Sequence, residues 1–284
     1  MRRSTIGDLE LSVIDANDSD TQFLYDEVFV SQIYHHPKMR IPASPTIMDV
    51  GANVGIYTIW AQRRYQPAAV YCYEASPRTF AYLEDNIARL ADRQATRISA
   101  VNCAIASRSG EKLVLNHGTR ISGLSTLLDA SKVGWMAEAF ADGGMTAYEV
   151  MSSTVSDEMA SNRLDAIDIL KIDVEGYFME VLKGIAPKDF ARIANMVMEL
   201  DYLPETGIKP AGSKSCCGRR AIAPIGSTRR KRTISCCTLG ANDRAARSGR
   251  RTAALRAFAF DRAVSRMIGN LVASPQRSKE AFRS

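Results

Sequence analysis

Short apolar runs alternate with amphipathic stretches along most of the chain, and this alternation predicts an α/β domain. The apolar runs are short, as in "TIMDV" and "ISAVNCAIA", which is typical of buried strands. Strands joined through helices form parallel sheets, so we expect a mainly parallel sheet with helices on both faces. The expected strands are residues 46–50, 68–74, 98–106, 166–176 and 193–201, and the expected helices are 54–64, 76–90 and 177–185.

Two regions depart from this alternation. Before the first strand, apolar residues recur at helical intervals and predict a helix that covers the edge of the domain; they are Phe23, Leu24, Val28, Ile33 and Tyr34. Between residues 111 and 162, two extended segments at 111–117 and 147–155 flank an irregular insert at 126–144. In open α/β sheets ligands bind beyond the carboxyl ends of the strands, so we expect this insert to act as a lid over the site.

Charge divides the chain after residue 207. Residues 1–207 carry 19 Lys and Arg against 28 Asp and Glu, whereas residues 208–284 carry 18 against 3. The overall net charge of +6 therefore averages two unlike segments. We expect an N-terminal helical cap at 1–44, a ligand-binding α/β domain at 45–207, and a basic, largely disordered tail at 208–284.

The tail shows no clear binding motif. Its cysteines form the doublets Cys216–Cys217 and Cys236–Cys237, and adjacent cysteines lack the spacing of zinc ligands, so we predict no metal. The basic run at 229–232 has no interleaved aromatic residues on which bases would stack, and nucleic-acid binding is not favoured. No apolar run reaches the roughly 18 to 20 residues of a membrane span, and the first residues do not read as a signal peptide, so we expect a cytoplasmic protein.

The glycine loop "MDVGANVG" at residues 48–55 is the first candidate for chemistry. It lacks both the G-x-G-x-x-G spacing of dinucleotide folds and the Lys-Ser/Thr pair of phosphate-binding loops. Asp49 would repel a phosphate but would suit a ligand that carries an ammonium or sulfonium charge. Glu74 ends the next strand, where a carboxylate can accept hydrogen bonds from a ribose diol. Without further motifs, a nicotinamide dinucleotide would remain an alternative ligand.

Several motifs in order make the chain similar to the FkbM-type family of S-adenosylmethionine-dependent methyltransferases. They are "MDVGANVGIYT", "VYCYEASPRTFAYLEDNI", "VNCAIASRSGEKLVL", "RISGLSTL" and "DILKIDVEGYFMEVLKGI", and the resemblance spans roughly residues 20–203. It implies a Rossmann-like methyltransferase fold with S-adenosylmethionine as the cofactor. It also implies methyl transfer to a hydroxyl oxygen of a small molecule or glycan, such as a polyketide or a sugar.

The resemblance assigns cofactor-binding roles to individual residues. The loop residues Asp49, Gly51, Asn53 and Gly55 would surround the methionine part of the cofactor, and Glu74 would hold the ribose.

Two further residues each have a structural alternative. Tyr57 would either face the sulfonium through a cation–π contact or pack in the core. Asn102 lies next to Cys103 and Ala104 in the usual neighbourhood of the adenine, and plain packing is its alternative, depending on strand phase.

The catalytic candidates centre on "LKIDVEG". Asp173 is our first candidate for the base that removes the acceptor's proton, with Lys171 and Glu175 beside it. The alternative is a Lys171–Asp173 ion pair that only shapes the turn. His117 is a second candidate base, followed by His35 or His36, because histidine titrates near neutral pH.

The end of the chain departs from the family pattern. Relatives continue after the fifth strand with further strands, whereas here the basic tail follows and resembles translation in a shifted reading frame or a recombined end. We therefore expect the C-terminal strands to be missing, the strand at 193–201 to form an exposed sheet edge, and stability to be weak. The alternatives to an active O-methyltransferase are a degenerate, inactive cofactor-binding protein, a nicotinamide-dependent oxidoreductase and a nucleic-acid binder.

Overall fold

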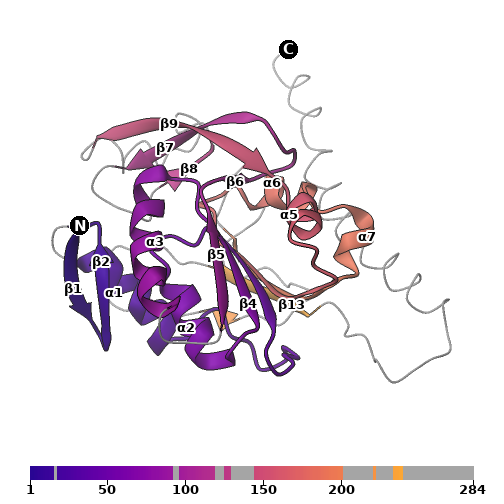
Figure 1. Ribbon diagram of the computed structural model, residues 1–284, viewed down its shortest axis with the longest axis horizontal. Helices are drawn as coiled ribbons and strands as arrows, with labels where there is room; N and C mark the ends of the chain where they lie inside the picture. The colour runs from indigo at the N-terminus through magenta and orange to yellow at the C-terminus, as the bar shows by residue number, and fades with distance from the viewer. Residues whose placement is uncertain are drawn as a thin grey trace, which may run out of the picture.

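A computed structural model describes residues 1–15, 18–91, 96–118, 125–128 and 144–200, together with the backbone of two strands at 220–221 and 233–238. Its main sheet has the strand order β12-β13-β11-β10-β3-β4-β5 (Figure 1). The five parallel strands are β3 (Thr46–Val50), β4 (Ala69–Tyr73), β5 (Arg97–Val101), β10 (Ile167–Ile172) and β11 (Ile193–Leu200). In the described part of the chain, no helix has the length and apolar character needed to cross a bilayer.

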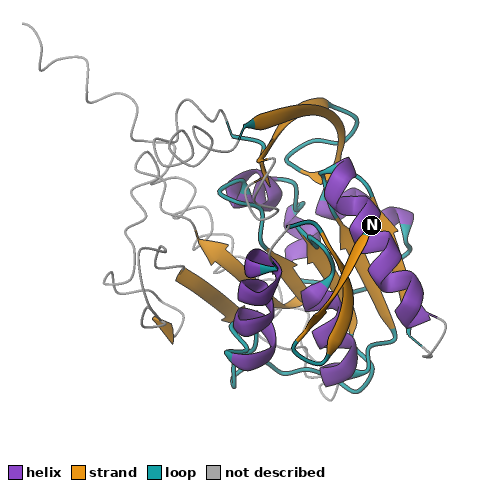
Figure 2. Cartoon of the chain, turned by 90° about the vertical axis from the view of Figure 1, so that its left-hand side faces the viewer, coloured by secondary structure: helices purple, strands orange, loops and turns teal. Residues whose placement is uncertain are grey.

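Helices cover both faces of this sheet, as predicted (Figure 2). Successive strand residues point to opposite faces, so Ile47 packs with α2 (Ile56–Tyr65) and α3 (Pro77–Ala91). Met48 packs on the other face with α5 (Val155–Ser161) and α6 (Phe178–Lys183), and α7 (Pro187–Phe190) adds Phe190 to the same cluster. The sheet is therefore buried on both sides, which is why its strands are almost continuously apolar.

The N-terminal segment contains more than the predicted helix. It starts with an antiparallel hairpin of β1 (Arg2–Ile6) and β2 (Leu9–Val13), which the hydrophobic pattern did not lead us to expect. The helical part follows as α1 (Ser19–Tyr25) and the π-helix η1 (Asp26–Val30). Leu11 of the hairpin joins the core beside α2 and α3. The Asn86 side chain accepts a hydrogen bond from the Ser12 backbone N–H at 2.8 Å and so fixes the hairpin to α3.

A second sheet has the order β6-β9-β7-β8, and Figure 1 shows it along the top of the main sheet. Its strands are β6 (Ala104–Ile105), β7 (Lys112–Gly118), β8 (Ser125–Thr126) and β9 (Met145–Ser153). The two predicted extended segments are thus confirmed as β7 and β9. The predicted strand at 98–106 is wrong in its extent, because β5 ends at Val101 and the chain then joins the second sheet as β6. Most of the predicted lid lies outside the described residues.

The predicted sheet edge at β11 is also wrong. β13 (Thr233–Thr238) pairs antiparallel with β11 from Asn195 to Leu200, and β12 (Arg220–Ala221) pairs with β13. The sequence of β13, "TISCCT", is rich in β-branched residues, which favour strands. At least one strand therefore completes the sheet beyond β11. The rest of the predicted disordered tail lies outside the described residues.

Candidate active site

One cavity opens where β3 and β10 lie side by side and their chain connections lead to opposite faces of the sheet. This is the switch point at which open α/β sheets bind ligands. Five of the residues predicted for the site line it: Gly51, Asn53, Glu74, Asp173 and Glu175. The predicted residues that do not line it are Asp49, Gly55, Tyr57, Asn102, His117 and Lys171.

The glycine loop brings the ends of β3, β4 and β10 together. Gly51 has a φ of +75°, and its N–H donates to the carbonyl oxygen of Tyr73 at the end of β4. A Cβ atom on Gly51 would lie 1.7 Å from the carbonyl oxygen of Asp173. Only glycine fits such an approach, so Gly51 is required by strand packing. Gly55, with a φ of +94°, precedes α2 and packs against Leu83 outside the cavity.

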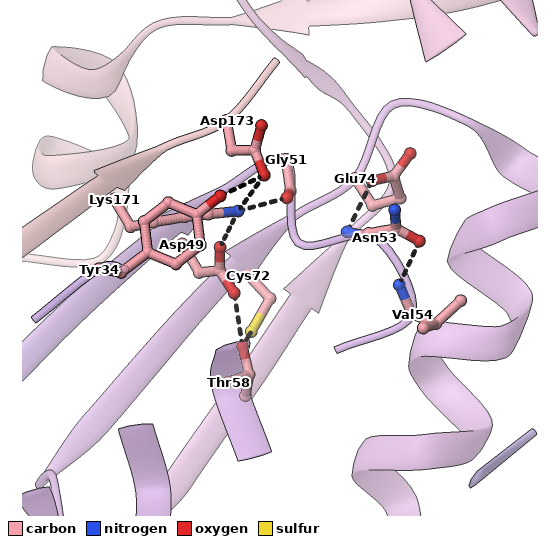
Figure 3. Close-up of polar contacts among 10 residues, drawn as sticks. All are labelled: Tyr34, Asp49, Gly51, Asn53, Val54, Thr58, Cys72, Glu74, Lys171 and Asp173. Atoms are coloured by element: carbon pink, nitrogen blue, oxygen red, sulfur yellow. Dashed lines mark hydrogen bonds and ion pairs between the residues drawn. The ribbon is translucent and has the colours of Figure 1, made fainter. Parts of the chain in front are cut away.

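Both carboxylate oxygens of Glu74 are held by backbone N–H groups, one of them from the glycine loop. Oε2 accepts the Asn53 N–H of the loop at 2.9 Å (Figure 3), and Oε1 accepts the Ser76 N–H at 2.9 Å. Burial raises the pKa of Glu74 to about 7, although the two backbone hydrogen bonds oppose the shift. Each carboxylate oxygen has more than one acceptor site, so Glu74 can still accept hydrogen bonds from a ligand in the cavity.

The Asp49 side chain lies on the face of the sheet that α2 covers, and it does not line the cavity. It is directly opposite Lys171 in the β3–β10 register, with Oδ1 3.1 Å from the ammonium nitrogen. Its other oxygen accepts a hydrogen bond from the Thr58 hydroxyl of α2 at 2.7 Å (Figure 3). Lys171 also donates to the Gly51 carbonyl at 2.7 Å, and both charged side chains are buried. Strand phase therefore makes Asp49 and Lys171 a buried ion pair beneath the loop, which differs from their predicted roles.

Asp173 follows β10 and faces the cavity. Its Oδ2 accepts a hydrogen bond from the Tyr34 hydroxyl at 2.7 Å and lies 3.6 Å from the Lys171 ammonium. The predicted Lys171–Asp173 ion pair is thus present, but Lys171 is closer to Asp49. Glu175 lines the cavity with a left-handed φ of +45°, and its carbonyl oxygen accepts a hydrogen bond from the Thr126 hydroxyl of β8.

Tyr57 belongs to the core, which was the alternative to cofactor binding. Its ring packs edge-on against Tyr34, with the ring centroids 5.4 Å apart. The Lys171 ammonium lies 5.8 Å from the Tyr57 centroid and 5.4 Å from the Tyr34 centroid. The cation beside these rings is therefore the Lys171 ammonium, whereas the sequence had suggested the sulfonium of the cofactor for Tyr57.

None of the three candidate histidines lines the cavity. His117 is fully buried, and its Nδ1 lies 2.7 Å from the Ser125 hydroxyl and 3.2 Å from the Ser76 hydroxyl. Burial lowers the pKa of His117 to about 4, so it is a weak base. The Nδ1 of His35 contacts the Tyr65 hydroxyl at the end of α2, and that of His36 accepts the Lys38 N–H.

Asn102 has a structural role, which the sequence analysis gave as the alternative to adenine binding. Its side-chain amide donates to the carbonyl oxygens of Glu74 at 2.8 Å and Ala75 at 3.1 Å, so it ties the ends of β4 and β5 together. The next three residues line the cavity instead: Cys103, Ala104 and Ile105.

Sequence reasoning missed several residues of the cavity wall. Leu24 from α1, Ser125 and Leu127 from the β8 segment, and Tyr177 after β10 all line it. Leu24 was expected only to cover the domain's edge, because periodicity places it on a helix but gives no contact with a distant loop. Ser125 falls in a motif that was used for the family resemblance alone, whereas Leu127 lies in the insert that was expected to act as a lid.

Among the described residues of the cavity wall, the charged side chains are carboxylates. Glu74 lies at the end of β4 beside the apolar wall of Cys103 and Ile105, and Asp173 lies at the end of β10 beside Glu175. Such a wall suits a ligand with hydroxyl donors at one end, a flat apolar part and a positive charge.

Comparisons with known proteins agree with the resemblance seen in the motifs. The family model described as "Methyltransferase FkbM domain" matches residues 49–214. The methyltransferase sdnD of Sordaria araneosa is 30% identical over 209 residues, which cover 67% of this chain and 78% of that protein. The 31-O-demethyl-FK506 methyltransferase FkbM of Streptomyces tacrolimicus is 30% identical over 206 residues, with coverages of 66% and 78%.

Among solved structures, similarity is found to the methyltransferase FkbM of Methylobacillus flagellatus KT. The TM-score is 0.42 at 16% identity, and the match covers 62% of this chain and 36% of that chain. This chain therefore spans about a third of that protein.

Proposed function

The chain belongs to the FkbM-type family of S-adenosylmethionine-dependent methyltransferases, and we propose that it transfers the cofactor's methyl group to a hydroxyl oxygen of a small molecule or glycan. The observation that carries the proposal is that two carboxylates, those of Glu74 and Asp173, line one cavity. One relative's name specifies an O-demethylated substrate, which supports oxygen as the acceptor atom.

The cavity residues fit the cofactor. Glu74 would accept hydrogen bonds from the ribose hydroxyls, and the apolar wall at residues 103–105 would contact the adenine. The glycine loop would approach the cofactor through its backbone at Gly51 and Asn53, which both line the cavity. When bound, S-adenosylmethionine supplies a methyl group made electrophilic by the positive sulfonium. The carboxylate of Asp173 would stabilise that positive charge at the same wall.

Asp173 is the residue that we assign to the acceptor hydroxyl. Methyl transfer to an alcohol is an in-line displacement, so the oxygen must be aligned with the methyl group and must lose its proton as the new bond forms. A carboxylate at the cavity wall can accept that proton and orient the hydroxyl. Glu175, two residues later, is placed to contact the acceptor or to receive the proton from Asp173. Their backbones are fixed by the Gly51 contact and by Thr126.

Calorimetric titration with S-adenosylmethionine tests the cofactor site. We expect saturable binding by the unaltered chain and weakening by at least about tenfold in Glu74→Gln, which removes the charge that best accepts the ribose hydroxyls. Glu84→Gln is the matched control, because Glu84 is exposed on α3 away from the cavity. Equal affinity of the Glu74 and Glu84 variants would contradict the assignment.

The reaction itself is tested with methyl-labelled S-adenosylmethionine and a panel of sugar and polyketide alcohols. The expected result is label transfer to a hydroxyl oxygen, which forms a methyl ether, and loss of this transfer in Asp173→Asn even at saturating cofactor. Saturable cofactor binding with no transfer to any acceptor would favour an inactive cofactor-binding chain. Titration with NAD under the same conditions tests the oxidoreductase alternative.

A further inference from the structure

Tyr34 connects the N-terminal segment to the candidate active site. It lies in the turn after η1, fifteen residues before the region that the FkbM family model matches, and only 3% of its surface is exposed. Its hydroxyl nevertheless donates to Oδ2 of Asp173, 139 residues later in the sequence, at 2.7 Å (Figure 3).

The two contacts made by Asp173 in Figure 3 reach the same carboxylate oxygen. Tyr34 donates to Oδ2, and the Lys171 ammonium lies 3.6 Å from that atom. The other carboxylate oxygen points away from both residues in Figure 3. Lys171 is closer to two other oxygens, Oδ1 of Asp49 at 3.1 Å and the carbonyl of Gly51 at 2.7 Å. The Tyr34 hydroxyl is therefore the shorter restraint on the Asp173 carboxylate.

The Tyr34 ring is itself held in place. It packs edge-on against the buried Tyr57 of α2, and the Lys171 ammonium lies 5.4 Å from its centroid. A buried ring between a helix and a cation has little freedom to turn its hydroxyl elsewhere. The orientation of the hydroxyl, and with it that of Asp173, is thus determined by packing.

We propose that Tyr34 is a positioning residue for methyl transfer: its hydroxyl fixes the Asp173 carboxylate by one oxygen so that the other faces the acceptor hydroxyl. The inference rests on the proposed function of Asp173. Leu24 of α1 lines the same cavity, so the N-terminal segment reaches the site at two points. The acceptor side of the site is accordingly built in part from residues outside the matched family region.

The first test follows Asp173 without any acceptor. Carboxyl ¹³C NMR titration of the aspartates, with the Asp173 signal assigned from Asp173→Asn, is carried out for the unaltered chain and for Tyr34→Phe. Phenylalanine keeps the ring and removes the hydroxyl. Loss of a hydrogen bond that stabilises the charged carboxylate should raise the measured pKa of Asp173 by about one pH unit.

Tyr25→Phe is the matched control for this titration. Tyr25 lies in the same N-terminal segment and donates to Asp8 at 3.0 Å, and it does not itself line the cavity. We expect the Asp173 titration to be unchanged in Tyr25→Phe. An Asp173 titration that is equally unchanged in Tyr34→Phe would overturn the inference, whatever happens to thermal stability.

The second test uses an alcohol that the unaltered chain methylates. Tyr34→Phe should lower kcat by about tenfold and move the acidic limb of the pH profile upward, with the Kd for S-adenosylmethionine unchanged. A lower melting temperature with an unchanged kcat and pH profile would mean that Tyr34 is only structural. If the unaltered chain methylates no alcohol, the proposed function fails, and the NMR titration still decides whether Tyr34 positions Asp173.

Discussion

Gly51 and Asp173 approach each other so closely that a Cβ atom on Gly51 would lie 1.7 Å from the carbonyl oxygen of Asp173. The Asp173 N–H also donates to the carbonyl oxygen of Val50 at 3.0 Å, which continues the parallel pairing of β3 and β10 past the strand ends. The glycine loop and the residue that carries the Asp173 carboxylate, which both line the cavity, are therefore held together by one backbone contact.

Gly51→Ala should break this contact and destabilise the fold by more than the backbone strain of a left-handed φ alone. We expect a loss of about 3 kcal/mol or more in the free energy of unfolding, because the residue keeps a left-handed φ and its Cβ meets backbone that cannot move away. Gly110→Ala is the control, since Gly110 has a similar φ of +77° with nothing within 4 Å of its Cβ position. It should cost about 1 kcal/mol. Urea denaturation followed by circular dichroism measures both, and equal losses would contradict the argument.

The strands of the main sheet were predictable because their composition is set by burial on both faces. β3 runs from Thr46 to Val50 as expected, and Ile47 and Met48 join different cores. The N-terminal hairpin also left a signal, since two five-residue strands flank the turn residues Gly7 and Asp8. The helical pattern that follows it is stronger, and the helix was the element that we predicted for this segment.

Side-chain direction at the site was much less predictable. Motifs identified Glu74 and Asp173 correctly as cavity residues, because both follow strand ends. Asp49 lies inside a strand, where its direction depends on phase relative to the helices, and its partner Lys171 is 122 residues away. The contact between Tyr34 and Asp173 likewise requires the folded arrangement of α2 and the N-terminal segment, which no local pattern contains.

Removing the Lys171 ammonium should strongly destabilise the fold. Asp49 has no exposed surface, and Lys171→Met would leave its carboxylate buried without its counter-ion, so we expect a loss of about 3 to 5 kcal/mol in the free energy of unfolding. Asp49→Asn combined with Lys171→Met removes both charges while an oxygen remains for Thr58. The double variant should therefore be more stable than Lys171→Met alone. A double-mutant cycle from chemical denaturation measures this, and losses that simply add would show that the two charges are not coupled.

The affinity for S-adenosylmethionine should fall as pH decreases through 7. Burial raises the pKa of Glu74 to about 7 in the ligand-free chain, and protonation removes the charge that best accepts the ribose hydroxyls. Between pH 8 and pH 6 this effect should weaken binding by up to about tenfold. Calorimetric titration should show that Glu74→Gln removes this slope while Glu84→Gln keeps it. A Glu74→Gln variant with the full slope would place the titrating group elsewhere.

Stability should also depend on pH through His117. Burial lowers the pKa of this imidazole to about 4 in the folded chain, whereas the unfolded chain binds the proton near the ordinary histidine pKa of 6.5. The unfolded state therefore takes up the proton first, so the contribution of His117 is present above pH 6.5 and is lost as pH falls toward 4. The loss is at most about 3 kcal/mol.

His117→Asn tests this because it keeps a polar atom near Ser125 and cannot titrate. Denaturation curves between pH 7 and pH 4 should show a smaller loss of stability on acidification in His117→Asn than in the unaltered chain. Ser125→Ala, which keeps the imidazole, should retain the full loss. Glu74 acts in the opposite sense, since its raised folded pKa favours the folded state at low pH, but it is common to all three proteins and cancels in the differences. Parallel curves for the unaltered chain and His117→Asn would mean that His117 takes up its proton equally in both states.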